Sequence, residues 1–368
     1  SKTKGANVMQ YKYLTGTGAM ISRVSLGSTT FGDQLDYAGS CTVLDAAVDH
    51  GINMIDTGNQ YAGGESERVI GRWLEERGNR DKLIIGTKVD LPTGDGVNER
   101  GASRINIMNA VENSLRALRT DYIDIYYLHH PDRNTPLEES LDTMSCLVRS
   151  GKVRYVGFSN YSAWEACDMM WTAKTNGFVV PKVAQNVYNL LTRGADDEFA
   201  YFLRKYQTGF VIYNPLAGGL LTGKHTRDHI AEGSRFNSKM YQDRYWNDKN
   251  FDAIDILKSV AEEAGMSLVE LATRWCLSND FVDSVMMGFS KLSQLEQNIA
   301  AVEKGVLDPE IVKECDKAWD IIKCNAYPYF VPPTGSKGST GYSGSLMRYS
   351  FDEVNQKKGV ILCDLDKD

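Results

Sequence analysis

Eight short apolar segments recur along most of the chain, and this repeat limits the available folds more than any other feature. The first six begin roughly 30 to 40 residues apart, about the length of one βα unit. The segments are RVSLG (23–27), GINMID (51–56), KLIIGTK (82–88), YIDIYYLHH (122–130), KVRYVGFSN (152–160), KVAQNVYN (182–189), GFVIYNP (209–215) and DSVMMGF (283–289).

Amphipathic patterns typical of helices separate these segments, as in residues 65–77, 103–119 and 136–151. The alternation predicts the α/β class and, with eight units, a (β/α)8 TIM barrel. A doubly wound open sheet is disfavoured because no G-x-G-x-x-G motif follows the first segment.

Three stretches fall outside the repeat. Residues 9–22 resemble a β-hairpin that could plug the bottom of the barrel. Residues 214–250 are predicted to form a long functional loop after the seventh strand. The tail is rich in Gly and Ser. We therefore predict a barrel domain over residues 9–331 and a C-terminal extension over residues 332–368, with no second globular domain.

Composition and charge limit the classes of partner that the protein can bind. The formal net charge is −7 and no basic block is present, which argues against a nucleic-acid partner. No apolar stretch approaches the roughly 20 residues needed to span a membrane, and the first residues lack a signal-peptide pattern. The seven cysteines show no C-x-x-C spacing, so we expect neither a disulfide framework nor a zinc site made of them. These observations predict a cytoplasmic protein with a small-molecule partner, and they leave a homo-oligomer open.

Ionisable residues occur where three neighbouring strands are expected to end. Asp56, Lys88 and His129 close the second, third and fourth segments, and a barrel gathers such strand ends on one rim. Because side chains alternate along a strand, His129 should face inward beside Tyr61 and His130 should point the opposite way. Adjacent histidines that point apart do not make a metal site, so we expect no metal and disfavour a metal enzyme or hydrolase.

The chemistry of this group follows from electrostatics. A tyrosine phenol has an ordinary pKa near 10, and a nearby ammonium lowers it. Lys88 would therefore poise Tyr61 as a proton donor near physiological pH, while Asp56 keeps Lys88 charged and oriented. The group lacks a source of electrons.

Six motifs in order carry a family resemblance: IDTGNQYAGGESERVIGRWL, LIIGTK, DYIDIYYLHHPD, GKVRYVGFSNYS, QNVYNLL and YNPLAGGLLTGK. Together they resemble the aldo-keto reductase superfamily, and the long loop is similar to its aflatoxin-aldehyde reductase branch. The resemblance implies a (β/α)8 barrel that reduces aldehydes and ketones with NADPH. It also implies a catalytic tetrad of Asp56, Tyr61, Lys88 and His129, with Tyr61 as general acid or base and His129 orienting the carbonyl.

The resemblance further assigns binding residues. Those expected at the cofactor are Ser159, Asn160, Gln185, Tyr213, Asn214, Leu216, Gly218, Leu220, Gly223, Lys224, Arg235, Gly288, Ser290, Gln294, Gln297 and Asn298. Those expected around the carbonyl or alcohol substrate are Phe31, His130, Trp164 and the aromatic stretch 326–330.

Two questions stay open. The family's usual cluster for the 2′-phosphate is absent, so NAD remains an alternative to NADP, although Lys224, Arg235 and Lys291 could supply positive charge. The potassium-channel β proteins share this pattern, so a cofactor-binding regulatory subunit with slow reductase activity is the alternative to an oxidoreductase.

Overall fold

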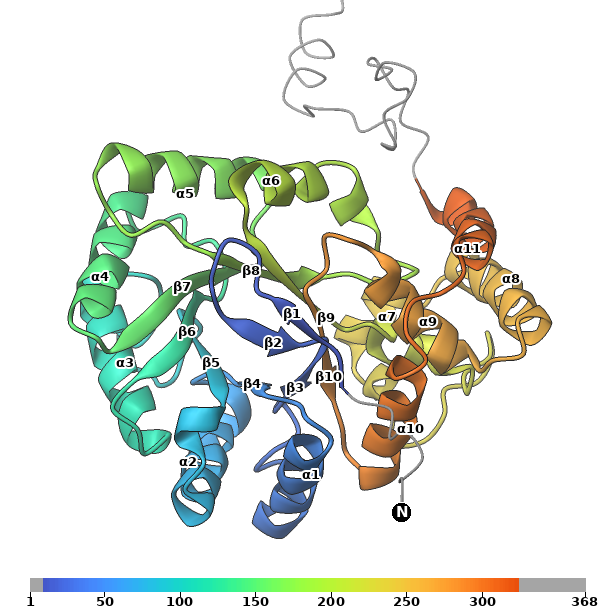
Figure 1. Ribbon diagram of the computed structural model, residues 1–368, viewed down its shortest axis with the longest axis horizontal. Helices are drawn as coiled ribbons and strands as arrows, with labels where there is room; N and C mark the ends of the chain where they lie inside the picture. Colours follow the sequence, from blue (N-terminus) through green and yellow to red (C-terminus); the bar gives the residue numbers. More distant parts are fainter. Residues whose placement is uncertain (1–8, 324–368) are drawn as a thin grey trace, which may run out of the picture.

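Eight parallel strands form a closed barrel at the centre of the protein (Figure 1). The computed structural model describes residues 9–323. The strands follow one another around the ring in chain order, and β10 closes it between β9 and β3. They are β3 (Val24–Gly27), β4 (Met54–Asp56), β5 (Ile84–Val89), β6 (Ile123–Leu128), β7 (Val153–Ser159), β8 (Val183–Val187), β9 (Gly209–Tyr213) and β10 (Ser284–Gly288). Each coincides with one of the eight apolar segments, so the predicted (β/α)8 barrel is confirmed.

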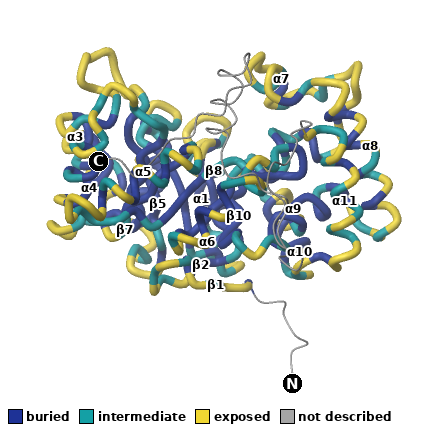
Figure 2. The backbone as a smooth tube through the Cα atoms, turned by 90° about the horizontal axis from the view of Figure 1, so that it is seen from above, coloured by how far each residue is buried: buried dark blue, intermediate teal, exposed yellow. Residues whose placement is uncertain are grey.

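An antiparallel hairpin of β1 (Tyr11–Tyr13) and β2 (Met20–Ser22) precedes the barrel. Figure 2 shows it at one end of the barrel and α7 (Lys239–Tyr245) at the other. Leu14 and Ile21 of the hairpin are completely buried and join the apolar cluster inside the barrel. The hairpin therefore plugs the end at which the strands begin, as the sequence predicted.

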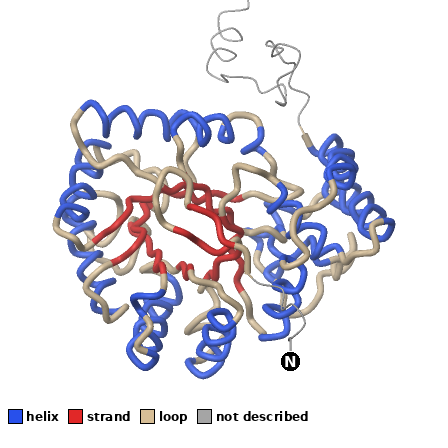
Figure 3. Tube along the Cα trace, viewed as in Figure 1, coloured by secondary structure: helices blue, strands red, loops and turns tan. Residues whose placement is uncertain are grey.

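Helices surround the strands on the outer side of the barrel (Figure 3). They are α1 (Tyr37–Asp49), α2 (Glu65–Arg77), α3 (Arg104–Ala117), α4 (Leu137–Arg149), α5 (Ala163–Thr175), α6 (Phe199–Tyr206), α7, α8 (Asp248–Glu263), α9 (Leu268–Ser278), α10 (Leu292–Val302) and α11 (Pro309–Ile322). Ser103 and Ser267 cap two of them by accepting a backbone N–H from the first turn. The helices bury apolar faces against the strands, with Trp73 and Trp275 fully enclosed.

The segment between β9 and α8 is more ordered than the long loop predicted from the sequence. It contains two 3₁₀ helices, η4 (Ala217–Thr222) and η5 (Arg235–Asn237), followed by α7. Phe236 anchors this segment because it is completely buried.

Two predictions lie outside the described residues: the extension over residues 332–368 and the aromatic substrate contacts at 326–330. Within residues 9–323, no helix has the length and apolar character needed to cross a bilayer.

Asp283 joins the hairpin to the barrel and gives a test of the plug. Its completely buried carboxylate accepts from the Thr15 backbone N–H and hydroxyl, both at 2.9 Å, and from the Phe210 N–H at 3.1 Å. Lys12 adds an ion pair at 2.7 Å. Asp283→Ala removes the shared acceptor, so we expect the free energy of unfolding to fall by about 3 kcal/mol in urea denaturation.

Asp280→Ala is the matched control. Asp280 pairs with Arg204 through side chains that are 77% and 50% exposed, so its loss should cost less than about 1 kcal/mol. Equal losses in the two variants would show that Asp283 does not anchor the hairpin.

Candidate active site

A buried ion pair joins the ends of β4 and β5. Asp56 is the last residue of β4, and Lys88 lies near the end of β5, its parallel neighbour. The Lys88 ammonium donates to the Asp56 carboxylate and, at 2.6 Å, to the Thr57 carbonyl oxygen. Both charged side chains are only 1% exposed. An unpaired charge at this depth would be strongly destabilising, so each charge requires the other.

The pair is held in its charged form. Burial alone would lower the pKa of Lys88, but Asp56 and Tyr61 together raise this pKa above its ordinary value. The Gln185 amide group donates to the second carboxylate oxygen of Asp56 at 3.0 Å. Lys88 is therefore an ammonium in a site that excludes water from its charge.

Tyr61 begins a 3₁₀ turn (Tyr61–Gly64) between β4 and α2. The Lys88 ammonium lies 5.1 Å from the centroid of the Tyr61 ring. Burial raises the pKa of Tyr61 above its ordinary value, and Lys88 opposes this shift without reversing it. The expected phenol with a pKa near physiological pH is thus not found in this structure. Tyr61 is instead held protonated, the form that can donate a proton.

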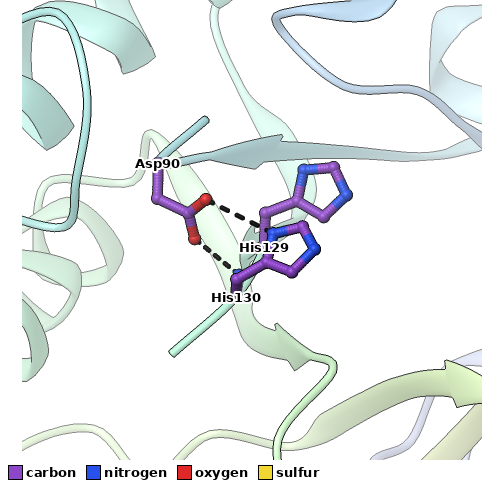
Figure 4. Close-up of side chains that lie close together, drawn as sticks. All are labelled: Asp90, His129 and His130. Atoms are coloured by element: carbon purple, nitrogen blue, oxygen red, sulfur yellow. Dashed lines mark hydrogen bonds and ion pairs between the residues drawn. The ribbon is translucent and has the colours of Figure 1, made fainter. Parts of the chain in front are cut away.

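His129 and His130 lie together rather than apart, so the prediction that they point in opposite directions is wrong. The alternation of β6 ends at Leu128, and beyond it the two rings stack with centroids 4.6 Å apart and planes at 26° (Figure 4). His129 is 7% exposed and its ring centroid is 6.0 Å from that of Tyr61. The His130 side chain lies further out, at 44% exposed.

The environment of His129 favours a neutral ring. Burial lowers the pKa of His129 to about 2, and the positive charges of Lys88 and His130 act in the same direction. A neutral imidazole carries one N–H donor and one acceptor nitrogen. His129 can therefore donate one hydrogen bond to an oxygen beside Tyr61.

Two residues of the site escaped the sequence analysis. The Gln60 amide group lies 3.3 Å from Nδ1 of His129, and the Asp90 carboxylate accepts the His130 backbone N–H at 2.6 Å. The position of Asp90 directly after β5 could have pointed to it, because polar residues at strand ends were already the signal for the site. Gln60 gave no comparable signal, because it lies in the loop before Tyr61.

The residues predicted at the nicotinamide form a hydrogen-bonded network at the ends of β7, β8 and β9. The Ser159 hydroxyl donates to the Gln185 carbonyl oxygen at 2.6 Å, and the Tyr213 hydroxyl donates to the Asn160 side-chain oxygen at 2.6 Å. Asn160 in turn donates to the His129 carbonyl oxygen at 2.9 Å. The structure therefore brings these four residues together next to the ion pair.

The segment predicted along the pyrophosphate winds tightly after β9. Its predicted residues are Asn214, Leu216, Gly218, Leu220, Gly223 and Lys224. Gly218 and Gly223 have φ of +69° and +77°, a conformation that favours glycine and lets a ligand approach the backbone closely. The Asn214 side chain fixes the turn by accepting the Gly218 N–H at 2.6 Å.

The residues predicted at the adenosine lie around the start of α10. They are Arg235, Gly288, Ser290, Gln294, Gln297 and Asn298. Arg235 is exposed, and its Nη2 atom lies 4.0 Å from the position that a Cβ would take on Gly288. The Gln294 side-chain oxygen accepts the Ser290 N–H at 3.0 Å. The Asn298 side-chain oxygen is buried and has no hydrogen-bond partner among residues 9–323.

The predicted substrate residues are not all placed where a ligand could reach them. Phe31 is completely buried in the core between strands and helices, so it faces no open pocket in this structure. Trp164 is 54% exposed in the first turn of α5. Gln297, predicted at the adenosine, is exposed and also lines a hollow of about 480 Å³ together with Glu270 and Lys304.

Comparison with known proteins identifies the class. The Aldo/keto reductase family matches residues 23–320, which include all eight barrel strands. The chain therefore belongs to the Aldo/keto reductase family, a family of oxidoreductases that use nicotinamide cofactors.

The curated relatives include proteins named as channel subunits and proteins named as reductases. A "Probable voltage-gated potassium channel subunit beta" from Oryza sativa subsp. japonica is 36% identical over 315 residues, which cover 84% of this chain and 96% of the relative. "Aflatoxin B1 aldehyde reductase member 2" from Rattus norvegicus is 34% identical over 322 residues, covering 83% and 86%. The human protein of the same name is also 34% identical, covering 83% and 88%.

The dependence of Asp56 and Lys88 on each other can be measured with a double-mutant cycle. Asp56→Asn and Lys88→Met each leave one buried charge unpaired, so each should lower the free energy of unfolding by about 3 to 5 kcal/mol. The double variant should lose less than the sum of the two, because it buries no charge. Chemical denaturation followed by far-UV circular dichroism tests this, and additive losses would show that the two charges do not stabilise each other.

Proposed function

We propose that this protein is a cytoplasmic, NADPH-dependent carbonyl reductase that interconverts an aldehyde or ketone and its alcohol. The observation that carries the proposal is the buried Lys88–Asp56 pair, which directs its ammonium at the ring of Tyr61 beside the neutral His129. In this proposal Tyr61 is the proton donor and His129 the hydrogen-bond donor, and the centroids of their rings lie 6.0 Å apart. Carbonyl reduction requires both at the substrate oxygen.

In the proposed mechanism, a nicotinamide cofactor held by Ser159, Asn160, Gln185 and Tyr213 would supply the hydride. His129 donates a hydrogen bond to the carbonyl oxygen, and Tyr61 transfers its phenolic proton to that oxygen as the alcohol forms. The Lys88 ammonium stabilises the resulting phenolate, and Asp56 keeps Lys88 charged and in position. In the oxidation direction, the Tyr61 phenolate accepts the proton.

The described residues fit a nicotinamide dinucleotide. Ser159, Asn160, Gln185 and Tyr213 offer amide and hydroxyl groups and an aromatic ring next to Asp56. Within α10, the Asn298 oxygen, which has no hydrogen-bond partner among the described residues, can accept from an adenine amino group. We propose NADPH over NADH because the exposed cations Arg235 and Lys224 can bind a 2′-phosphate.

A second candidate function is a regulatory subunit that retains bound cofactor. The rice and rat relatives match this chain almost equally well, at 36% and 34% identity. A subunit of this kind would show slow turnover and cofactor that stays bound through gel filtration. A reductase would release its cofactor and turn over rapidly.

Tyr61→Phe tests the proton donor. It removes only the phenolic oxygen, so the rate of carbonyl reduction should fall by about 10²- to 10⁴-fold. NADPH binding, followed by quenching of protein fluorescence, should stay within about twofold of the wild type. A variant that keeps more than half of the wild-type rate, with the chemical step shown to be rate-limiting, would remove Tyr61 from the mechanism.

Arg235→Ala tests the choice of cofactor. If Arg235 binds the 2′-phosphate, NADPH binding should weaken by roughly 1.5 to 3 kcal/mol, the usual contribution of a hydrogen bond to a charged group. NADH binding should change little, because NADH lacks this phosphate. Arg244→Ala, which removes another exposed arginine of the same segment, is the control. Equal losses for both cofactors in Arg235→Ala would argue against phosphate recognition.

A further inference from the structure

Asp90, His129 and His130 form a compact cluster of potential ligand atoms at the rim. One ligand atom from each of the three side chains lies within 4.8 Å of the other two (Figure 4). Asp90 and His129 are buried, whereas His130 is partly open to solvent. The cluster therefore has two side chains held in the protein interior, Asp90 and His129, and one that solvent can reach, His130.

The two oxygens of Asp90 have different environments. Oδ2 accepts the His130 backbone N–H at 2.6 Å, which fixes the carboxylate. Oδ1 lies 3.7 Å from Nδ1 of His130, which is too long for a hydrogen bond. This Nδ1 atom is buried and has no hydrogen-bond partner within the described residues. Asp90 is therefore the electrostatic neighbour of this nitrogen but not its hydrogen-bond partner, which leaves the nitrogen available to a ligand.

The backbone of Asp90 gives an independent indication. Its φ is +114°, a conformation that residues with a side chain rarely adopt. Held in this conformation, Asp90 sets its carboxylate against the two imidazole rings. Strain of this kind occurs preferentially at ligand-binding and catalytic sites.

We propose that Asp90, His129 and His130 bind one Zn²⁺ ion at the rim of the barrel. Two imidazoles and one carboxylate are a ligand set that Zn²⁺ takes, with a water or substrate oxygen in the fourth position. Bonds of about 2.0 to 2.2 Å place tetrahedral ligand atoms about 3.3 Å apart. The 3.7 Å separation of Asp90 and His130 is close to this value. The remaining ligand nitrogen, on His129, belongs to the group of atoms that lie within 4.8 Å of one another, so metal binding requires this ring to rotate slightly toward the other two ligands.

An ion bound to His129 would affect carbonyl reduction, because His129 is also the proposed hydrogen-bond donor to the substrate. Because Nδ1 of His129 faces the Gln60 amide group at 3.3 Å, Nε2 is the nitrogen left both for the metal and for the N–H that a carbonyl needs. Zn²⁺ bound to Nε2 takes the place of this proton, so Zn²⁺ and the carbonyl compete. Zn²⁺ would therefore raise the apparent KM for the carbonyl and leave cofactor binding unchanged. This competition rests on the proposed role of His129 in reduction, whereas metal binding itself does not.

Binding is tested by calorimetric titration of the full chain with ZnCl₂ in a buffer free of chelators. His130→Phe keeps a ring stacked on His129 but removes its nitrogens, and Asp90→Asn keeps the shape of the side chain but removes its charge. Each should weaken Zn²⁺ binding at least tenfold. His50→Phe, at an exposed position after α1, should leave the affinity unchanged. Circular dichroism and NADPH binding verify that each variant is folded.

The outcomes separate this proposal from the proposed function. No saturable Zn²⁺ binding by the wild type, or equal affinity in all four proteins, would overturn the site. Binding that the two cluster variants lose, without a rise in KM for the carbonyl, would overturn the competition but support the site. Absence of carbonyl reduction by the metal-free wild type would count against the proposed function alone, because the titration does not depend on turnover.

Discussion

The buried ion pair between Asp56 and Lys88 is the interaction on which the candidate site depends. Removing two charges from water costs several kcal/mol for each ion, and only precise placement offsets this cost. The placement comes from the barrel itself: β4 and β5 pair in register with Asp56 opposite Gly86. A Cβ on Gly86 would lie 2.9 Å from the Asp56 carboxylate, so the glycine leaves room for the charge.

The two ends of the barrel have separate tasks. At one end, Leu14 and Ile21 of the hairpin fill the interior and Asp283 fixes the hairpin in place. At the other end, the strands deliver Asp56 and Lys88 from a rigid frame. Because the hairpin plug and the candidate site lie at opposite ends of the barrel, the loops around the site can adopt unusual conformations without exposing the apolar core.

The sequence predicted helices and strands well because the same βα pattern recurs eight times, so an irregular residue in one unit does not change the overall assignment. All eight apolar segments became strands, and the pattern at 65–77 became α2 with the same bounds. Single side chains were harder to predict. The side chains of His129 and His130 do not alternate because β6 ends at Leu128. The residue at which a strand ends depends on its pairing with neighbouring strands rather than on the local sequence.

Burial was the other quantity that the sequence could not supply. The effect of Lys88 on the pKa of Tyr61 follows from residue types, but burial outweighs it and can be judged only in the folded protein. For the same reason, Phe31 was expected at a pocket and lies in the core. Both errors arise because exposure is a property of the whole fold.

Departures from regular backbone geometry concentrate around the candidate site. Most of the described non-glycine residues with positive φ lie there: Ala62 beside Tyr61, Asp90, Asn160, and Asn214 with Ala217 after β9. The other two, Arg119 and Gln207, follow helices α3 and α6. Asp90 holds the backbone N–H of His130, and Asn160 holds the carbonyl oxygen of His129. The two histidines are thus fixed from both sides by residues in unfavourable conformations. Local rules tend to fail where function requires a particular geometry, so the strain supports a role in ligand binding for this pair rather than one in packing alone.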